Sequence, residues 1–178
     1  LNMEAAKLVC AGLGISATDF YSHITTFKGA ARRLELVGKS DSANVFKDFA
    51  HSPSKLEATI HAVKAQFPDR KLIACIELHT FSSLNKDFLA EYGNTMNQAD
   101  KAYVFIDKKT FEQKKMEPYP AEVVKDAFLR DDLVFFNTPE ALLAELQGLK
   151  LANANLLMMS SGNFGGIDLV ELKNKIIQ

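Results

Sequence analysis

The sequence predicts an α/β fold: a Rossmann-like, mostly parallel sheet with flanking helices, preceded by a short helical segment and a β-hairpin. The first observation behind this prediction is that apolar runs of strand length alternate with helical stretches from residue 53 onward, which is the order of βαβ units. The second is the length of 178 residues with 47% hydrophobic residues, which suffices for one α/β domain with its own core.

The first fifty residues supply the helices and the hairpin. Residues 3–12 are rich in strong helix formers, and Ser16 or Thr18 can cap a second short helix. Two strand-like stretches, residues 34–37 and 44–49, flank a segment of turn-forming residues. We therefore expect a hairpin between them.

The rest of the chain alternates between the two kinds of element. Pro53 suits the first turn of a helix that runs to about Gln66. Strands are then expected at residues 71–78, 102–106, 133–136 and 156–159, and helices at residues 84–92, 120–129, 139–147 and 167–177. We interpret residues 108–115 as a solvated, charged loop. Cys10 and Cys75 lie in apolar runs and are expected to be buried, inert thiols.

The composition argues against several classes of protein. The net charge of -1 lacks the basic excess of a duplex-binding domain, so nucleic acid is not an expected partner. No apolar run approaches the ~18 residues of a membrane span and no signal peptide is visible, so we expect a cytoplasmic protein. There is also no Walker A loop and no Gly-x-Gly-x-x-Gly turn. The sequence begins at Leu1 within a helical pattern, from which we expect a piece of a longer protein.

The loops that follow strands are the candidate sites, because an open parallel sheet binds ligands beyond the carboxyl ends of its strands. Residues 160–166, Ser-Ser-Gly-Asn-Phe-Gly-Gly, can turn several backbone N–H groups toward an anion. A helix expected from Ile167 would add its positive end. We therefore predict that this loop receives a carboxylate; the alternative is a flexible turn.

Three further groups of residues could bind a ligand. Asp48 could accept ribose hydroxyls and His51 could stack on a base, or the two could belong to a helix-capping cluster. Arg32 and Arg33 could fork onto phosphate oxygens, or could be a surface pair without a partner. Residues 79–83 place a histidine and hydroxyls after a strand, either for a polar ligand or to cap the next helix.

Taken in order, these segments resemble the Mur ligases over essentially the whole chain. Residues 2–6, Asn-Met-Glu-Ala-Ala, are similar to the second half of the family signature His-Asn-x-x-Asn-x-x-Ala-Ala. Residues 27–35 resemble the hinge into the third domain, and residues 48–53, Asp-Phe-Ala-His-Ser-Pro, resemble its Asp-Tyr-Ala-His-x-Pro motif. The resemblance implies that residues 1–28 are the tail of the central ATP-binding domain and residues 29–178 the carboxy-terminal domain.

The resemblance implies an ATP-dependent, amide-bond-forming ligase of the bacterial cytoplasm. Such enzymes join an amino acid or a peptide to UDP-N-acetylmuramate in peptidoglycan synthesis or cell-wall recycling, and so support cell shape and division. ATP phosphorylates the muramoyl carboxylate, and the incoming amine attacks the acyl phosphate. The P-loop, most Mg2+ ligands and the UDP-sugar pocket belong to the N-terminal and central domains of the same chain. We therefore expect this chain alone to be inactive.

The resemblance also assigns roles to single residues. Asn2 would contact adenine, and Arg33 would be the catalytic residue that contacts the γ-phosphate. Asp48 would hold the ribose, with His51 nearby. The amine substrate would be received by His79, Thr80, Ser82, Ser160, Ser161, Gly162 and Asn163.

Within the family, residues 48–51 and 159–166 look most like the murein peptide ligases, which add L-alanyl-γ-D-glutamyl-meso-diaminopimelate. His79 departs from the Arg-Ser pair usual in that group and is closer to the His-Arg pair of the ligases that add L-alanine, which are the alternative. A stand-alone flavodoxin-like binding module is the alternative from another class. The helical residues 1–25 argue against that module.

Overall fold

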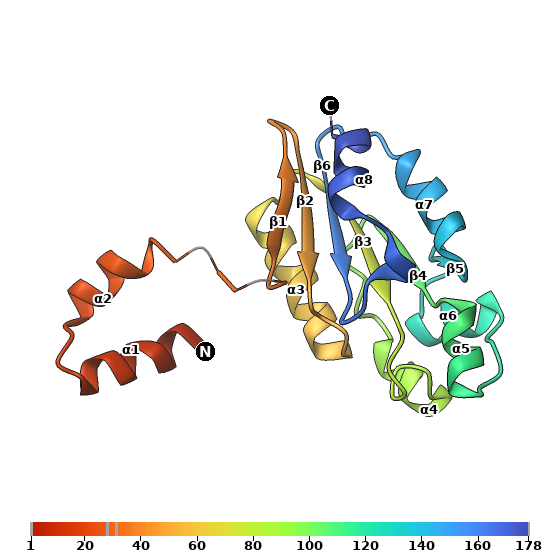
Figure 1. The fold of residues 1–178 in the computed structure, drawn as a ribbon, viewed down its shortest axis with the longest axis horizontal. Helices are drawn as coiled ribbons and strands as arrows, with labels where there is room; N and C mark the ends of the chain where they lie inside the picture. Colours follow the sequence, from red (N-terminus) through yellow and green to blue (C-terminus); the bar gives the residue numbers. More distant parts are fainter. Residues whose placement is uncertain (1, 28, 31, 178) are drawn as a thin grey trace. The chain divides into compact units, whose positions relative to one another are not determined.

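The computed structural model in Figure 1 describes residues 2–27, 29–30 and 32–177. The chain divides into two compact units, Leu1–Ala31 and Arg32–Gln178. Leu1, at which we expected the first helix to be already running, and Lys28 and Ala31 of the predicted hinge lie outside the described residues.

The first unit consists of the two predicted helices, α1 (Asn2–Gly12) and α2 (Ala17–Ile24). Ser16 is the residue that caps α2, because its Oγ accepts a hydrogen bond from Asp19 N at 3.1 Å. In α1 no residue is buried, and Cys10 is only partly buried. The expectation of a buried thiol at Cys10 was therefore wrong, since a two-helix unit is too small to enclose it.

The second unit contains the sheet. Its strands are β1 (Glu35–Lys39), β2 (Ala43–Asp48), β3 (Lys71–Glu77), β4 (Lys101–Phe105), β5 (Val134–Phe136) and β6 (Ala154–Met159). Their order in space is β1-β2-β6-β3-β4-β5. The predicted hairpin is confirmed, because β1 pairs with β2 in antiparallel fashion. All other pairs are parallel, which confirms the predicted mostly parallel sheet.

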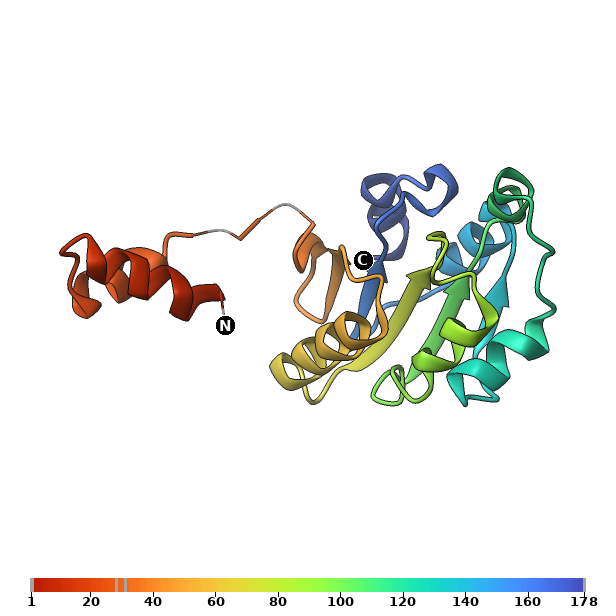
Figure 2. The same cartoon turned by 90° about the horizontal axis from the view of Figure 1, so that it is seen from below.

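Helices cover both faces of this sheet. They are α3 (Pro53–Gln66), α4 (Lys86–Leu89), η1 (Ala90–Tyr92), α5 (Lys108–Lys114), α6 (Ala121–Phe128), α7 (Pro139–Gln147), η2 (Phe164–Gly166) and α8 (Leu169–Ile176). Buried side chains of α3, η1 and α6 pack in one apolar cluster, and those of α7 and α8 pack in a second. Figure 2 shows α3 and α8 on opposite sides of the sheet.

The two central strands explain how both clusters form. Every residue of β6 is buried, with Leu157 in the first cluster and Leu156 and Met158 in the second. A strand that is covered on both faces has this continuous apolar pattern. Cys75 of β3 is buried as predicted, and its burial raises the pKa of the thiol well above the usual value. A thiol in that state is inert at neutral pH.

The segment expected as a solvated loop is the helix α5. Asp107 begins the helix by accepting a hydrogen bond from Lys109 N at 2.9 Å through its Oδ1. Phe111 is buried in the first apolar cluster, and Lys115 ends the helix with a φ of 55°. The charged residues hid this helix, because only one large apolar side chain of the segment points inward.

The last helix begins later than predicted. α8 starts at Leu169, after the short turn η2, and not at Ile167. Asp168 Oδ1 accepts hydrogen bonds from Val170 N and Glu171 N, so the amino end of α8 is capped by the chain's own carboxylate. The positive helix end that we expected to add to the glycine-rich loop is therefore already neutralised.

Within residues 2–27, 29–30 and 32–177, no helix is both long and apolar enough to cross a membrane.

Candidate functional site

The topology of the sheet marks one place for a ligand. The chain runs from β2 to β3, β4 and β5 and then returns to insert β6 between β2 and β3. The connections that follow β2 and β3 lead to helices of the first apolar cluster, whereas the connection after β6 leads to α8 on the other face. Ligands of such sheets bind where neighbouring connections diverge. The candidate site therefore lies at the carboxyl ends of β2, β6 and β3, at the lower edge of the sheet in Figure 1.

Arg33, Phe49 and His51 lie together at the β2 end of this site. The guanidinium of Arg33 lies over the ring of Phe49, 5.1 Å from its centroid, and the Phe49 and His51 rings meet edge-on at 5.3 Å. His51 Nδ1 donates to the carbonyl oxygen of Phe49 at 2.9 Å, which in the neutral ring leaves Nε2 as an acceptor. This arrangement can offer a cationic fork to an anion and an aromatic surface to a planar ring.

Asp48 accepts hydrogen bonds from the backbone next to this cluster. It is 7% exposed, and both of its oxygens accept backbone hydrogen bonds of 2.7 Å, Oδ2 from Leu34 N and Oδ1 from Ala50 N. Thr59 Oγ1 lies 3.5 Å from Oδ1. The ribose contact expected for Asp48 stays a prediction. These hydrogen bonds give the carboxylate a definite structural role. They hold the backbone at Leu34, next to Arg33, and at Ala50, next to His51.

The backbone around Arg33 is held in an uncommon conformation. Arg32 and Leu34 both have positive φ, 57° and 43°, which costs an ordinary side chain about 1–2 kcal/mol each. Hydrogen bonds from Arg32 N to Glu35 Oε2 and from Phe49 N to Arg32 O stabilise this turn. Strain that the surrounding structure maintains is typical of functional segments.

Tyr92 connects the β2 and β3 sides of the site. Its buried hydroxyl donates to the carbonyl oxygen of His51 at 2.6 Å, and its ring stacks on Phe128. Burial raises the pKa of Tyr92 to about 12, so the hydroxyl keeps its proton at physiological pH. The loop that carries His51 is therefore attached to the helical turn that follows the β3 loop.

Glu77, the last residue of β3, contacts the glycine-rich loop. It is 5% exposed, and its Oε2 accepts hydrogen bonds from Ser160 Oγ and, at 2.8 Å, from Phe164 N. Gly162 N donates to Ser160 Oγ at 2.6 Å. Two of the donors that we expected to receive a substrate carboxylate are thus occupied by a carboxylate of the chain itself.

Two glycines of this loop, Gly162 and Gly165, have no room for a side chain. A Cβ at Gly162 would lie 2.7 Å from Glu77 Oε2 and 3.3 Å from His79 Cε1. At Gly165 it would lie 2.8 Å from Pro139 Cβ, and the φ of +65° is itself unfavourable for other residues. Gly162 and Gly165 are closely packed, which favours an ordered loop over the flexible turn that was its alternative interpretation.

The β3 loop presents fewer free groups than its sequence implies. His79 is partly buried, and its Nδ1 is a buried atom that has no hydrogen-bond partner among the described residues. The Thr80 and Ser83 side chains are hydrogen-bonded to each other, Thr80 Oγ1 donating to Ser83 Oγ at 2.9 Å. Ser82 is exposed and Ser83 is buried. Of these residues, Ser82 offers an exposed hydroxyl to a ligand, and the His79 ring is only partly exposed.

The remaining predicted residues are Ser161, Asn163 and Asn2. Ser161 is partly buried and Asn163 exposed, both on the loop after β6. Asn2 lies in α1 of the first unit and is exposed. The structure thus brings the predicted residues of the second unit to one edge of one sheet. The adenine contact expected of Asn2 stays a prediction.

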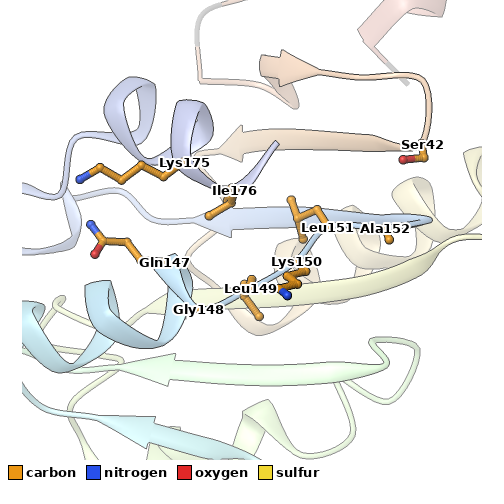
Figure 3. Close-up of a pocket in the computed structure, with 9 residues that line it drawn as sticks. All are labelled: Ser42, Gln147, Gly148, Leu149, Lys150, Leu151, Ala152, Lys175 and Ile176. Carbon is orange, nitrogen blue, oxygen red and sulfur yellow. The ribbon is translucent and has the colours of Figure 1, made fainter. Parts of the chain in front are cut away.

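A hollow elsewhere in the second unit does not involve these residues. It has a volume of about 460 Å³ and lies at the amino ends of the strands, where Ser42, Lys150 and Lys175 line it (Figure 3). Neither this hollow nor one of about 420 Å³ between α3 and residues 94–98 contains a predicted site residue. In the part of the chain that the structure describes, no group of three or more His, Cys, Asp or Glu side chains could hold a metal ion.

The comparison with protein families assigns the chain to one of them. The family model described as "Mur ligase, glutamate ligase domain" matches residues 32–162. This chain belongs to the Mur ligases. The match covers the second unit from Arg32 to the glycine-rich loop, and with it every predicted site residue except Asn2 and Asn163.

Relatives of this Mur ligase domain agree with that assignment. The UDP-N-acetylmuramate–L-alanine ligase of Lactococcus lactis subsp. cremoris is 35% identical over 104 residues, which are 58% of this chain and 23% of the relative. The chain therefore spans about a quarter of that relative's length. The structure of the murein peptide ligase of Psychrobacter arcticus matches 99% of this chain and 37% of its own, with 24% identity and a TM-score of 0.67. The UDP-N-acetylmuramate–alanine ligase of Thermotoga maritima matches 99% and 36%, with 16% identity and a TM-score of 0.71. These two likenesses show the shared fold.

Sequence reasoning missed three residues of the site. Phe49 was part of a quoted motif, but its contact with Arg33 is a tertiary feature. Glu77 closes an apolar strand, and an acidic residue at that position was the available signal. The exposed ring of Phe81 has Lys114 of α5 over it, 3.7 Å from the centroid, and that contact was hidden because α5 was not expected.

Proposed function

We propose that this Mur ligase domain is the carboxy-terminal domain of an ATP-dependent ligase that joins an amino acid or a peptide to UDP-N-acetylmuramate in the bacterial cytoplasm. Residues 1–28 would then belong to its central ATP-binding domain. The observation that carries the proposal is the meeting of two different clusters at one switch point of the sheet. Arg33, Phe49 and His51 lie after β2, and Glu77, His79 and Ser160 lie after β3 and β6.

The β2 cluster suits the nucleotide. Arg33 is exposed and always charged, so it can fork onto the oxygens of a phosphoryl group during transfer to the muramoyl carboxylate. The strained turn that Asp48 holds would direct this guanidinium, and the Phe49 and His51 rings provide an apolar surface for the nucleoside. Most magnesium ligands would lie in the other domains of the ligase, because the residues that the structure describes bring no three candidate ligands together.

The β3 and β6 loops suit the amine substrate, which attacks the acyl phosphate formed by ATP. Two substrates are candidates. L-Alanine is favoured by His79 and by the L-alanine ligase that is 35% identical to this chain. The tripeptide L-alanyl-γ-D-glutamyl-meso-diaminopimelate is favoured by the Asp-Phe-Ala-His motif and by residues 159–166. The sequence motifs favour the tripeptide, and the 35% identity over 104 residues supports L-alanine as the first amine to test.

Amine profiling of the complete ligase tests this proposal. With ATP, Mg2+ and UDP-N-acetylmuramate present, ADP formation should depend on one of the two amines. We expect L-alanine to give the higher kcat/KM. A ligase that releases no ADP with either amine would contradict the proposal. The isolated 178-residue chain should release none under the same conditions, because no element of its sequence cradles a triphosphate together with magnesium.

A further inference from the structure

Glu77 is a buried carboxylate without a cationic partner. It is 5% exposed, and no ion pair between described residues includes it. Its two hydrogen bonds come from neutral donors, Ser160 Oγ and Phe164 N, and both end on Oε2. A charge that is removed from water without a counter-charge is costly. A cation bound beside this carboxylate would therefore be favoured.

The other oxygen of Glu77 is free to bind that cation. Oε1 accepts no hydrogen bond from any residue that the structure describes, and it is not among the buried atoms that lack a partner. It therefore keeps contact with solvent while Oε2 faces the glycine-rich loop. The carboxylate has one oxygen for the protein and one for a ligand.

His79 lies beside this carboxylate. Both side chains flank Gly162, where a Cβ would be 2.7 Å from Glu77 Oε2 and 3.3 Å from His79 Cε1. His79 Nδ1 is also buried without a partner among the described residues. A carboxylate oxygen is an acceptor for a group with several N–H donors, and the imidazole nitrogen would become a second acceptor if the ring turned toward the ligand. A primary ammonium has three such donors and the missing positive charge.

We propose that Glu77, with His79 beside it, binds the ammonium group of the incoming amino acid or peptide. This inference rests on the proposed function and names the part of the substrate that each loop recognises. The ammonium binds at Glu77 Oε1, the oxygen that keeps contact with solvent. A substrate carboxylate is excluded from Ser160 Oγ and Phe164 N, because Glu77 already occupies both donors and repels a second negative charge.

Two other roles for Glu77 make different demands. A divalent metal needs several oxygen or nitrogen ligands, and residues 32–177 bring no three acidic, histidine or cysteine side chains together. A purely structural role, in which Glu77 only anchors the loop, needs an acceptor at Oε2 but no charge. Glutamine could supply that acceptor through its amide oxygen. The Glu77→Gln variant therefore separates recognition of a cation from anchoring of the loop.

The test uses the complete ligase and L-alanine, with L-lactate as the analogue that keeps the carboxylate and lacks the ammonium. If only the tripeptide is turned over, the tripeptide and its desamino analogue take their places. We expect Glu77→Gln to raise the KM for the amine at least tenfold, because a charge-assisted hydrogen bond contributes about 1.5–3 kcal/mol and 1.4 kcal/mol is a factor of ten. The inhibition constant of L-lactate should change less than twofold.

The control variant is Glu91→Gln, which removes an exposed carboxylate on η1 and should behave as the wild type. An unchanged amine KM in folded Glu77→Gln would show that Glu77 only anchors the loop and would overturn the proposal. Equal losses for L-alanine and L-lactate would show a disordered loop and would also overturn it. If Glu77→Gln does not fold, the wild type decides: L-alanine must bind at least tenfold more tightly than L-lactate.

Failure of the ligase proposal gives a separate result. If the wild type forms no ADP with any amine, calorimetric titration of L-alanine into the wild type and Glu77→Gln still tests the ammonium site. Binding to the wild type that is lost in the variant supports the site without the ligase activity. Equal binding to both proteins, or binding to neither, rejects it.

Discussion

The carboxylate of Asp48 accepts a hydrogen bond from the backbone N–H of Leu34 at 2.7 Å, and this bond holds the left-handed turn that carries Arg33. The two residues are 14 positions apart. Leu34 precedes β1 and Asp48 ends β2, which are the two strands of the hairpin. Asp48 thereby links the strand that ends at the candidate site to the segment that enters the sheet. Its effect on a ligand would be exerted through the position of Arg33.

We expect Asp48→Asn to destabilise the second unit. Both oxygens accept from backbone N–H groups, so the amide nitrogen of asparagine must face one of those donors. A buried donor that loses its acceptor costs about 1–3 kcal/mol. Urea titration should show this loss in the free energy of unfolding. Asp131→Asn, at an exposed position, is the control, and equal stability of the two variants would contradict the role given to Asp48.

Arg33→Lys should lower the kcat of the complete ligase by a factor of about 10³, with little change in the free energy of unfolding. Lysine keeps the charge but loses the planar fork that spans two phosphoryl oxygens. Steady-state ADP release measures the effect. Lys55→Arg on the exposed side of α3 is the matched control for the exchange. Wild-type turnover in Arg33→Lys would remove this residue from the site.

Gly162→Ala should raise the KM for the amine substrate and lower stability by about 1–3 kcal/mol. The added methyl group would lie 2.7 Å from Glu77 Oε2, so either the carboxylate or the loop must move. Thermal unfolding and initial-rate kinetics check both effects. ATP binding should change little, because Arg33 and His51 lie on the other side of β6.

The control for this substitution is Gly12→Ala, at the end of α1, where a Cβ would meet no atom within 4 Å. Any general effect of adding a methyl group would appear there too. If Gly162→Ala lowers stability but leaves the amine KM unchanged, the loop has only a structural role.

Tyr92→Phe should produce a pH-dependent difference in stability. The folded pKa of Tyr92, about 12, lies above the ordinary value of 10.0 because the hydroxyl is buried. A raised pKa means that the stability due to the neutral hydroxyl is fully present below pH 10 and is lost as the pH rises toward 12. The difference between wild type and Tyr92→Phe should therefore be constant below pH 10 and shrink above it.

Urea titrations at pH 8 to 12 would measure this difference. Tyr21→Phe, at an exposed position on α2, is the control, since its removal should leave the high-pH loss of stability in place. A difference between wild type and Tyr92→Phe that stays constant up to pH 12 would mean that the Tyr92 hydroxyl is not buried in the folded protein.

Much of the fold follows from local patterns in the sequence. The helix from Pro53 to Gln66 has the predicted bounds, because proline suits the first turn and apolar residues recur on one side. The strands β3 and β6 contain the apolar runs 72–76 and 156–159, which are distinctive in any chain. α5 was missed for the opposite reason, because a helix whose only large buried side chain is Phe111 looks like a charged loop.

The candidate site, like the fold, was predicted only in part from the sequence. Parallel strands end at one edge, so the sequence was enough to bring residues 48–51, 79–83 and 160–166 to the same side of the sheet. It could not show which donors of the glycine-rich loop are already used. Glu77 and Ser160 are 83 positions apart, and no spacing rule relates them. They meet because β6 is inserted beside β3, and no local pattern in the sequence reveals that strand order.

The sequence by itself determined the alternating elements, the parallel sheet and the edge at which a ligand would bind, because each of these depends on periodicity and on turn residues close together in the chain. Only the tertiary structure decided that Asp48 holds the backbone beside Arg33 and that Glu77 occupies the loop expected to hold a carboxylate. The physical reason is that a hydrogen bond depends on positions within a few tenths of an ångström. Such positions are set by the packing of the whole domain.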